Sequence, residues 1–289
     1  YTANTGVIMD DIVFGYQAHY HVLKISEANG VVSLVCECGV TYKLETEYIN
    51  YDGSDASVLN THYVGTGSSF NGGQNKWISN GEYFEAIADQ DADSAGHGQM
   101  QMWIPWTKDK TDDGSNYDDF TAANNAVGLL SFKANLLFAH KSDVFSIKVV
   151  HNSWDSDIEA NALNIHSVMS ADGTSVTGYS INIWNTDPAS NGQTRVLVID
   201  AGADGWSGWL DIQISFEFDE AADTVTGYYY VNGKYIGYGC KALATLNNGI
   251  SCAYINMNNW MTGTGVYLDD LVFGYTVDGH NTLDGQIHN

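Results

Sequence analysis

Basic residues are scarce in this sequence. Eleven lysines and arginines, with Arg195 as the single arginine, stand against 35 acidic residues in 289, and the formal net charge is −24. A chain of this charge is repelled by nucleic-acid phosphates and by anionic lipid. We therefore exclude nucleic acid as a partner. Neutral glycans and divalent cations remain compatible with the charge.

Long apolar runs and helical periodicity are also scarce. No run approaches the ~18–20 apolar residues that a membrane-spanning helix needs, so no membrane insertion is expected. The sequence begins without Met and without a basic-then-apolar signal segment, and we expect a processed or excised part of a longer chain. Low Lys and Arg, many Asn, Gly, Tyr and Trp, and four cysteines favour a secreted or cell-surface protein.

Alternating apolar and polar residues dominate the chain instead. Segments such as "DVFSIKVVHN", "YSINIWN" and "GISCAYINM" alternate over five to nine residues and are separated by Gly, Asn and Asp. Such segments predict strands, and their regular spacing predicts an antiparallel β-sandwich. One stretch, "DDFTAANNAVGLLSF", is expected to hold a short helix or turn.

Two segments near the end resemble a known family. "WLDIQISFEFDEAADTVTGYYYVNGKYIG" (Trp209–Gly237) has a Trp-led strand, an acidic turn and a strand ending in "VNG", and "GTGVYLDDLVFGY" places an Asp pair before an apolar run. Both resemble the concanavalin-A-like, laminin-G-like jelly rolls, over about residues 48–276. The resemblance implies an all-β antiparallel jelly-roll β-sandwich that binds or cleaves glycans.

A Cys/His segment precedes the sandwich. "AHYHVLKISEANGVVSLVCECGVTYKLE" (Ala18–Glu45) is similar to small Cys/His repeats of surface proteins of Gram-positive gut bacteria. A four-residue loop at Glu27–Gly30 would pair Ser26 with Val31 and bring four zinc ligands together on a small β-hairpin. These ligands are His19, His21, Cys36 and Cys38. The alternatives are four unrelated residues or a Cys36–Cys38 link.

Acidic clusters and the other two cysteines offer further sites. Calcium is a possible cofactor at Asp89, Asp91 and Asp93, with solvated acidic loops as the alternative. Asp270 follows Asp269 in a strand whose faces are both apolar. A carboxylate there must be paired, bonded to backbone N–H groups or metal-bound, for instance to calcium. Cys240 and Cys252 are expected either to form a disulfide between neighbouring strands or to be buried free thiols.

Aromatic residues among small polar ones indicate carbohydrate binding. Sugar rings stack on aromatic faces, while Asn, Asp and Gln bond their hydroxyls. We expect the binding residues on loops. The candidates are Trp103, Trp106, Trp184, Trp206, Asn185, Asp187 and Asn191. The alternative is that most tryptophans anchor the core, as is expected of Trp209.

Catalytic motifs are not apparent. Sandwich glucanases carry alternating acids on one strand, as in E-x-D-x-x-E, and no such phrase occurs. A lyase acting on acidic glycans would also need Lys or Arg near its substrate. An enzymatic function is therefore the less favoured interpretation of the sequence.

One phrase occurs twice. "TGVIMDDIVFGY" (Thr5–Tyr16) returns as "TGVYLDDLVFGY" (Thr264–Tyr275), which indicates one period of a tandem repeat. The predicted organisation is a strand left from a preceding copy (1–17), a Cys/His hairpin (18–47), the sandwich (48–276) and a tail or next repeat (277–289). Alternatively, both phrases belong to one sandwich.

These expectations converge on a non-catalytic extracellular module that binds a neutral polysaccharide within a larger surface protein. One alternative is a self-assembling surface subunit, a filament or adhesin, that binds other copies of itself by exchanging terminal strands. The second is a glycoside hydrolase or polysaccharide lyase.

Overall fold

The computed structural model describes the chain in segments: residues 23–28, 31–36, 38–39, 41–43, 49–51, 53–59, 65–68, 77–88, 98–105, 120–121, 127–150, 160–184, 192–202, 208–219, 224–242, 249–250, 252–259 and 261–276. Apart from the short 3-10 helix η1 (Ala56–Val58), the regular elements of these segments are strands. None of their helices has the length and apolar character needed to cross a membrane. The prediction of an all-β protein is confirmed.

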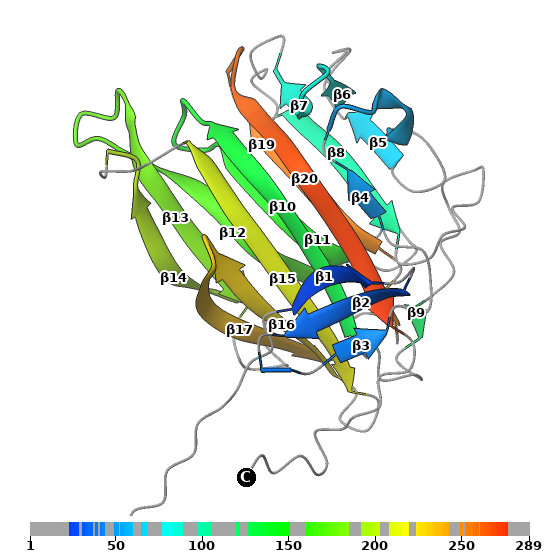
Figure 1. The fold of residues 1–289 in the computed structure, drawn as a ribbon. Coiled ribbons are helices and arrows are strands. Elements are labelled where there is room, and N and C mark those ends of the chain that lie inside the picture. Colours follow the sequence, from blue (N-terminus) through cyan, green and yellow to red (C-terminus); the bar gives the residue numbers. More distant parts are fainter. Residues whose placement is uncertain are drawn as a thin grey trace, which may run out of the picture.

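One layer of the sandwich is an eight-stranded antiparallel sheet (Figure 1). Its order is β17-β16-β15-β10-β20-β7-β6, and β4 also pairs with β20. The strands are β4 (Ile49–Tyr51), β6 (Ile78–Ser79), β7 (Phe84–Ile87), β10 (Val127–Leu137), β15 (Trp209–Asp219), β16 (Thr224–Val231), β17 (Lys234–Ala242) and β20 (Gly265–Thr276).

The other layer is a seven-stranded antiparallel sheet with the order β14-β13-β12-β11-β19-β8-β5. Its strands are β5 (Gly65–Ser68), β8 (Gly98–Pro105), β11 (Val144–Val150), β12 (Ala160–Met169), β13 (Val176–Trp184), β14 (Gln193–Asp200) and β19 (Cys252–Asn259). A separate pair is formed by β9 (Phe120–Thr121) and β18 (Gly249–Ile250). The helix or turn expected in "DDFTAANNAVGLLSF" is corrected in part, because Phe120–Thr121 and the residues from Val127 onward are strand.

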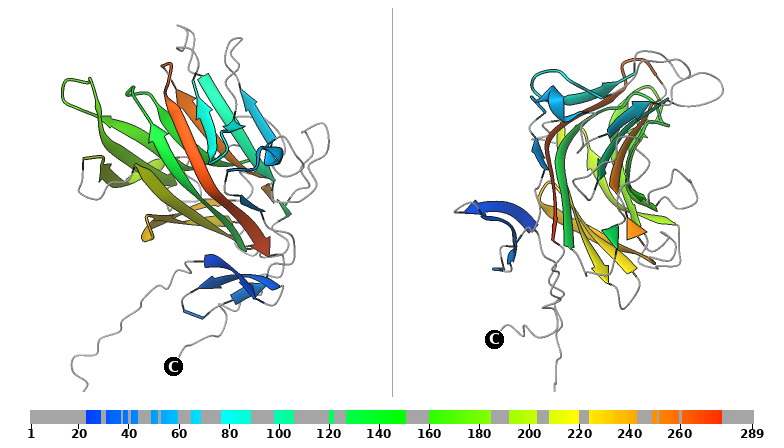
Figure 2. Two further views of the ribbon diagram at one scale, coloured as in Figure 1. Left: turned by 45° about the horizontal axis from the view of Figure 1, so that its top comes forward. Right: turned by 90° about the vertical axis from the view of Figure 1, so that its right-hand side faces the viewer.

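The core lies between the two layers, which are seen face to face in Figure 2. In central strands such as β10, β11, β13 and β15, alternate residues point inward and are almost fully buried, as the side-chain period of two requires. Phe132 on β10 meets Phe145 on β11 edge-on, with ring centroids 6.0 Å apart. This contact joins the two sheets near the middle of the core.

A third, smaller sheet precedes the sandwich. It consists of β1 (Leu23–Ala28), β2 (Val31–Cys36) and β3 (Thr41–Lys43), and Figure 2 shows it as a separate layer beside the eight-stranded sheet. The predicted hairpin exists, but its register was wrong. Ser26 pairs with Ser33 rather than Val31, because Ala28 and Val31 are partners and only two residues connect the strands. The repeated phrase Thr5–Tyr16 lies outside the described residues, so strand exchange stays a prediction.

The "VNG" phrase of the sequence is a tight hairpin turn. Val231 on β16 pairs with Lys234 on β17, so Asn232 and Gly233 alone connect the strands. Both have positive φ, 52° and 72°. Asn-Gly suits this turn because both residues tolerate the left-handed region.

We expect Gly178→Ala to destabilise the sandwich. A Cβ at Gly178 would lie 2.2 Å from the backbone oxygen of Ile199 on the neighbouring strand, and that backbone cannot yield without disturbing the β13–β14 pairing. Urea unfolding should show a loss of about 1–3 kcal/mol. The control is Gly202→Ala, where the Cβ meets only a side-chain oxygen at 3.3 Å. Equal stability of the two variants would contradict this account of Gly178.

Candidate functional site

A row of polar residues crosses five neighbouring strands of the seven-stranded sheet. In order from β19 to β14, its members are Asn256, Ser146, Asn164, Asn182 and Arg195. Each of these residues is the registered partner of the next one. Their neighbours along the strands, such as Ile147 and Ile181, lie in the core, so the row faces away from the eight-stranded sheet. With strands spaced by ~4.8 Å, the row is about 19 Å long. We call this surface the amide face.

A second row runs alongside the first, one pleat further along the strands. Its registered members are Asn258, Val144, His166, Ser180 and Val198. The Nδ2 group of Asn256 donates a hydrogen bond to Oδ1 of Asn258 at 3.0 Å. Amide and hydroxyl groups therefore follow one another both across and along the strands.

Several polar atoms of the amide face are buried without a partner. Asn256 is 1% exposed and Ser180 is 5% exposed. Within the described part of the chain, Oδ1 of Asn256, Oγ of Ser180 and Oδ1 of Asn182 have no hydrogen-bond partner. A buried polar atom without a partner costs free energy, on the order of 1–3 kcal/mol. These atoms are ready to accept hydrogen bonds, and Ser180 can also donate one.

The charges on the amide face are few and lie at its edge. Among its described side chains, Arg195 and Asp200 are formally charged at neutral pH, and both are on the edge strand β14. Burial lowers the pKa of His166, and the positive charge of Arg195 lowers it further. The imidazole is therefore neutral at pH 7.

Two of the predicted tryptophans have backbone positions on the strands of this sheet. Trp103 on β8 is the registered partner of Tyr254, and Trp184 on β13 comes two residues after Asn182. Their side chains lie outside the described part of the structure. The other predicted carbohydrate-binding residues also lie outside the described residues: Trp106, Trp206, Asn185, Asp187 and Asn191.

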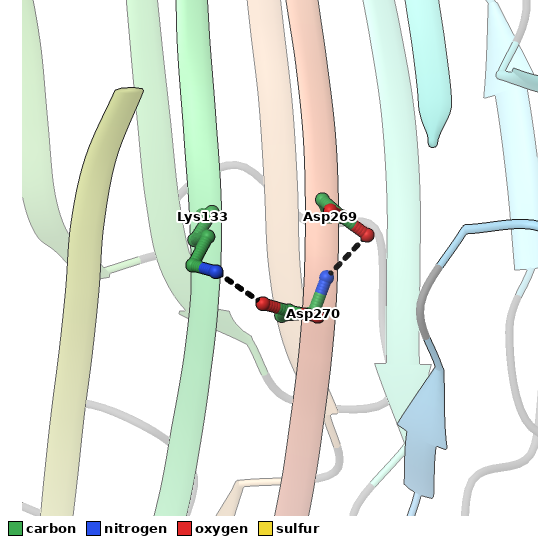
Figure 3. A network of polar contacts seen from close by, with 3 residues as sticks. All are labelled: Lys133, Asp269 and Asp270. Carbon is green, nitrogen blue, oxygen red and sulfur yellow. Dashed lines mark hydrogen bonds and ion pairs between the residues drawn. The ribbon is translucent and has the colours of Figure 1, made fainter. Parts of the chain in front are cut away.

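The Asp pair of β20 lies at a β-bulge on the outer face of the eight-stranded sheet (Figure 3). Asp270 has a positive φ of 49°, and the β10–β20 register shifts beside it. Its carboxylate is exposed and forms an ion pair with Lys133 at 2.5 Å, while its N–H donates to Oδ1 of Asp269 at 2.8 Å. The hydrogen bond that Lys133 donates to the Asp270 carboxylate raises the pKa of Lys133. Pairing and a local backbone bond thus accommodate both acids, and calcium at Asp270 stays a prediction.

The predicted zinc and calcium sites are only partly described. Cys36 is buried and Cys38 is exposed, and neither is in a disulfide, so the alternative Cys36–Cys38 link does not form. Cys36 pairs with Leu23, not with His21 as the expected register required. His19, His21, Asp89, Asp91 and Asp93 lie outside the described residues. Among the residues that are described, no three His, Cys, Asp or Glu side chains gather in a metal-binding group.

The expected Cys240–Cys252 disulfide is not present in the structure. Cys240 carries a free thiol on β17 of the eight-stranded sheet, and Oγ1 of Thr226 donates to its Sγ at 3.6 Å. Cys252 lies on β19 of the other sheet. The two cysteines thus flank a connection between sheets rather than between neighbouring strands.

An aromatic cluster occupies the outer face of the eight-stranded sheet. Tyr83 contacts Trp209 edge-on at 5.8 Å and Tyr267 at 4.6 Å between ring centroids. Trp209 is only half-buried, so its expected place in the core was wrong. The core position belongs to Leu210, the next residue.

Sequence reasoning looked for binding residues on loops and missed the amide face. A signal was available in phrases such as "LNIH", "SINI" and "YINMN", where Asn, Ser or His alternates with core residues on several strands. Outward positions on a solvated sheet usually include charged residues. A row of one hydroxyl and three amides on adjacent outward positions, as at Ser146, Asn164, Asn182 and Asn256, is therefore informative.

The comparisons with known proteins concern the fold. No protein-family model and no curated protein matched the sequence. Among solved structures, an endo-1,3-β-glucanase from Streptomyces sioyaensis is 11% identical, with 80% of this chain and 95% of that chain covered and a TM-score of 0.45. Winged bean acidic lectin complexed with methyl-α-D-galactose is 12% identical (80% and 98% covered, TM-score 0.41). A Bauhinia forficata lectin in complex with GalNAc is 11% identical (81% and 99%, 0.43). The strand pairing confirms the predicted antiparallel β-sandwich with a small N-terminal β-element.

We expect His166 to make stability depend on pH. Above pH 7 the imidazole is neutral in both the folded and the unfolded state. Below its ordinary pKa of about 6.5 the unfolded chain takes up the proton first, because the folded pKa is lowered, and stability falls. Urea unfolding should therefore show a larger loss of stability from pH 7.5 to pH 5.0 in the wild type than in His166→Gln. The same pH dependence in both proteins would refute this role.

Proposed function

We propose that this protein is a non-catalytic carbohydrate-binding module, and that the amide face binds a neutral polysaccharide. The observation that carries the proposal is the row of amide and hydroxyl groups across four strands, which ends at Arg195 on a fifth, together with the partnerless buried oxygens of Asn256 and Asn182 in this row and of Ser180 beside it. Sugar hydroxyls both donate and accept hydrogen bonds. Amide and hydroxyl side chains do the same, so the two surfaces are chemically complementary.

The charge of the amide face favours a neutral glycan over an acidic one. An acidic polysaccharide needs several cations along its length, and this face offers Arg195 at one edge and the backbone position of Lys148 two residues after Ser146 on β11. The net charge of the whole chain, −24, also repels a polyanion. A neutral polysaccharide needs no such cations and is not repelled by the net charge.

The shape of the row favours a ligand chain over a single sugar. Its length of about 19 Å follows from five strands in register, and successive amides recur at the strand spacing of ~4.8 Å. Repeated hydroxyl groups of an extended polysaccharide can meet repeated amides. Trp103 comes two residues after Gln101, the registered partner of Asn256 on β8, and Trp184 comes two residues after Asn182, so aromatic residues have backbone positions beside two places along the row.

The proposed ligand favours a location outside the cell. Polysaccharides of this kind are met at cell surfaces and in the extracellular space. A secreted or cell-surface location, within a larger surface protein, is part of the proposal.

Affinity electrophoresis in gels containing neutral glycans tests the proposal. The panel is hydroxyethylcellulose, laminarin, soluble starch and mannan, with alginate as the acidic comparison. Retardation by at least one neutral glycan, and none by alginate, is expected. Failure of every neutral glycan to retard the protein would refute the proposed function.

Point variants should assign the binding to the amide face. Ser180→Ala removes a buried hydroxyl that lacks a partner, so stability should stay equal or rise, while the lost ligand bond weakens binding about three- to tenfold. Asn182→Ala should weaken binding to a similar extent. Ser57→Ala, at an exposed residue of η1, is the matched control and should bind like the wild type. Wild-type affinity in both amide-face variants would remove this face from the proposal.

A further inference from the structure

A cavity lies on the opposite side of the sandwich from the amide face. It has a volume of about 410 Å³ and lies between strand β1 of the small sheet and the outer face of the eight-stranded sheet. Its polar lining comes from five side chains on four strands and thus from both sheets: Lys24, Ser131, Asp211, Gln213 and Tyr230. Cavities of this size hold small ligands in many proteins.

One lining group lacks a partner. Nε2 of Gln213 is buried, and within the described part of the chain no acceptor meets its N–H groups. Gln213 is the registered partner of Tyr230 on β16 and of Ser131 on β10, so three hydrogen-bonding side chains lie in one row under the cavity. An acceptor supplied by a ligand would relieve the unpaired amide.

The lining fixes the chemical class of that ligand. One cation, Lys24, and one anion, Asp211, face the same space, so their charges cancel and a strongly charged ligand is not favoured. The remaining groups are an amide and two hydroxyls, which offer donors and acceptors in turn. Vicinal hydroxyl groups of a neutral sugar satisfy such a set.

Aromatic rings continue the surface beyond the cavity. Trp209 comes two residues before Asp211 on the same face of β15, roughly 7 Å away along the strand. Its ring contacts Tyr83, which in turn contacts Tyr267. A second sugar ring, joined to one in the cavity, would reach this half-buried aromatic cluster, whose faces suit sugar C–H groups.

We propose that the cavity between β1 and the eight-stranded sheet is a second saccharide site, which binds one or two sugar units of a neutral glycan independently of the amide face. The two sites lie on the outer faces of opposite sheets. One molecule would then hold two glycan chains at once and join them. The small sheet takes part directly, because β1 contributes Lys24 to the site.

Titration calorimetry with trisaccharides tests the proposal. The probes are cellotriose, laminaritriose, maltotriose and mannotriose. A double variant, Ser180→Ala with Asn182→Ala, combines the two losses of affinity at the amide face, and it should still bind one equivalent of at least one probe at the cavity. Adding Gln213→Leu should weaken that remaining binding about tenfold or more. Absence of any binding by the double variant, or an unchanged affinity after Gln213→Leu, would overturn the second site.

The effect of these substitutions on folding is checked alongside the binding. Gln213→Leu is nearly isosteric and removes a buried donor that has no partner, so its melting temperature should not fall. Asp211→Asn keeps the size of the side chain and should also weaken binding. In the wild-type protein, the side-chain NH₂ resonances of Gln213 should shift on saturation with the bound trisaccharide. Unmoved resonances would refute the proposal without reference to any variant.

The two proposals fail separately. If binding is lost in the amide-face double variant and unaffected by Gln213→Leu, the proposed function stands and the second site falls. If the double variant binds with the affinity and stoichiometry of the wild type, and Gln213→Leu alone abolishes all binding, the second site stands and the amide face loses its role.

Discussion

The burial of two apolar sheet faces against each other is the constraint on which the rest of this structure depends. Each strand of the sandwich gives every second residue to that core, and the contact between Phe132 and Phe145 shows how closely the layers approach. Because the core takes one face of every strand, the other face is free to carry function. Both proposed sites are made of these outward residues, on opposite sheets.

Polar atoms without partners are the cost that this protein carries on its outer faces. Asn256, Asn182 and Ser180 on one sheet and Gln213 on the other each bury an atom that no described group satisfies. A sequence shaped by stability alone would place small apolar residues at such positions. Groups of this kind gain their partners when a ligand arrives, so the same residues lower the stability of the free protein and raise the affinity of the complex.

The Asp269–Asp270 pair shows how a locally unfavourable pair of residues is accommodated in a stable strand. Two carboxylates interrupt an apolar strand, and the bulge turns Asp270 out to solvent beside Lys133, while Asp269 binds the exposed N–H. The sequence alone restricted the ways to stabilise these carboxylates to an ion pair, a hydrogen bond from a backbone N–H group or a bound metal ion. Only the fold could choose, since Lys133 is more than a hundred residues away and reaches Asp270 through the pairing of β10 with β20.

The sequence by itself determined the class of fold, because alternation with a period of two and Asn-Gly at Asn232 and Gly233 are local signals that need no knowledge of distant residues. It also restricted the partners through the net charge of −24. The tertiary structure decided what depends on register and on pairing between distant strands. It shifted the β1–β2 hairpin by two residues, separated Cys240 from Cys252 onto different sheets, turned Trp209 outward, and aligned Asn256, Ser146, Asn164 and Asn182 in one row. Those four residues come from strands spread over more than a hundred residues, and only the order of strands in the sheet makes them neighbours.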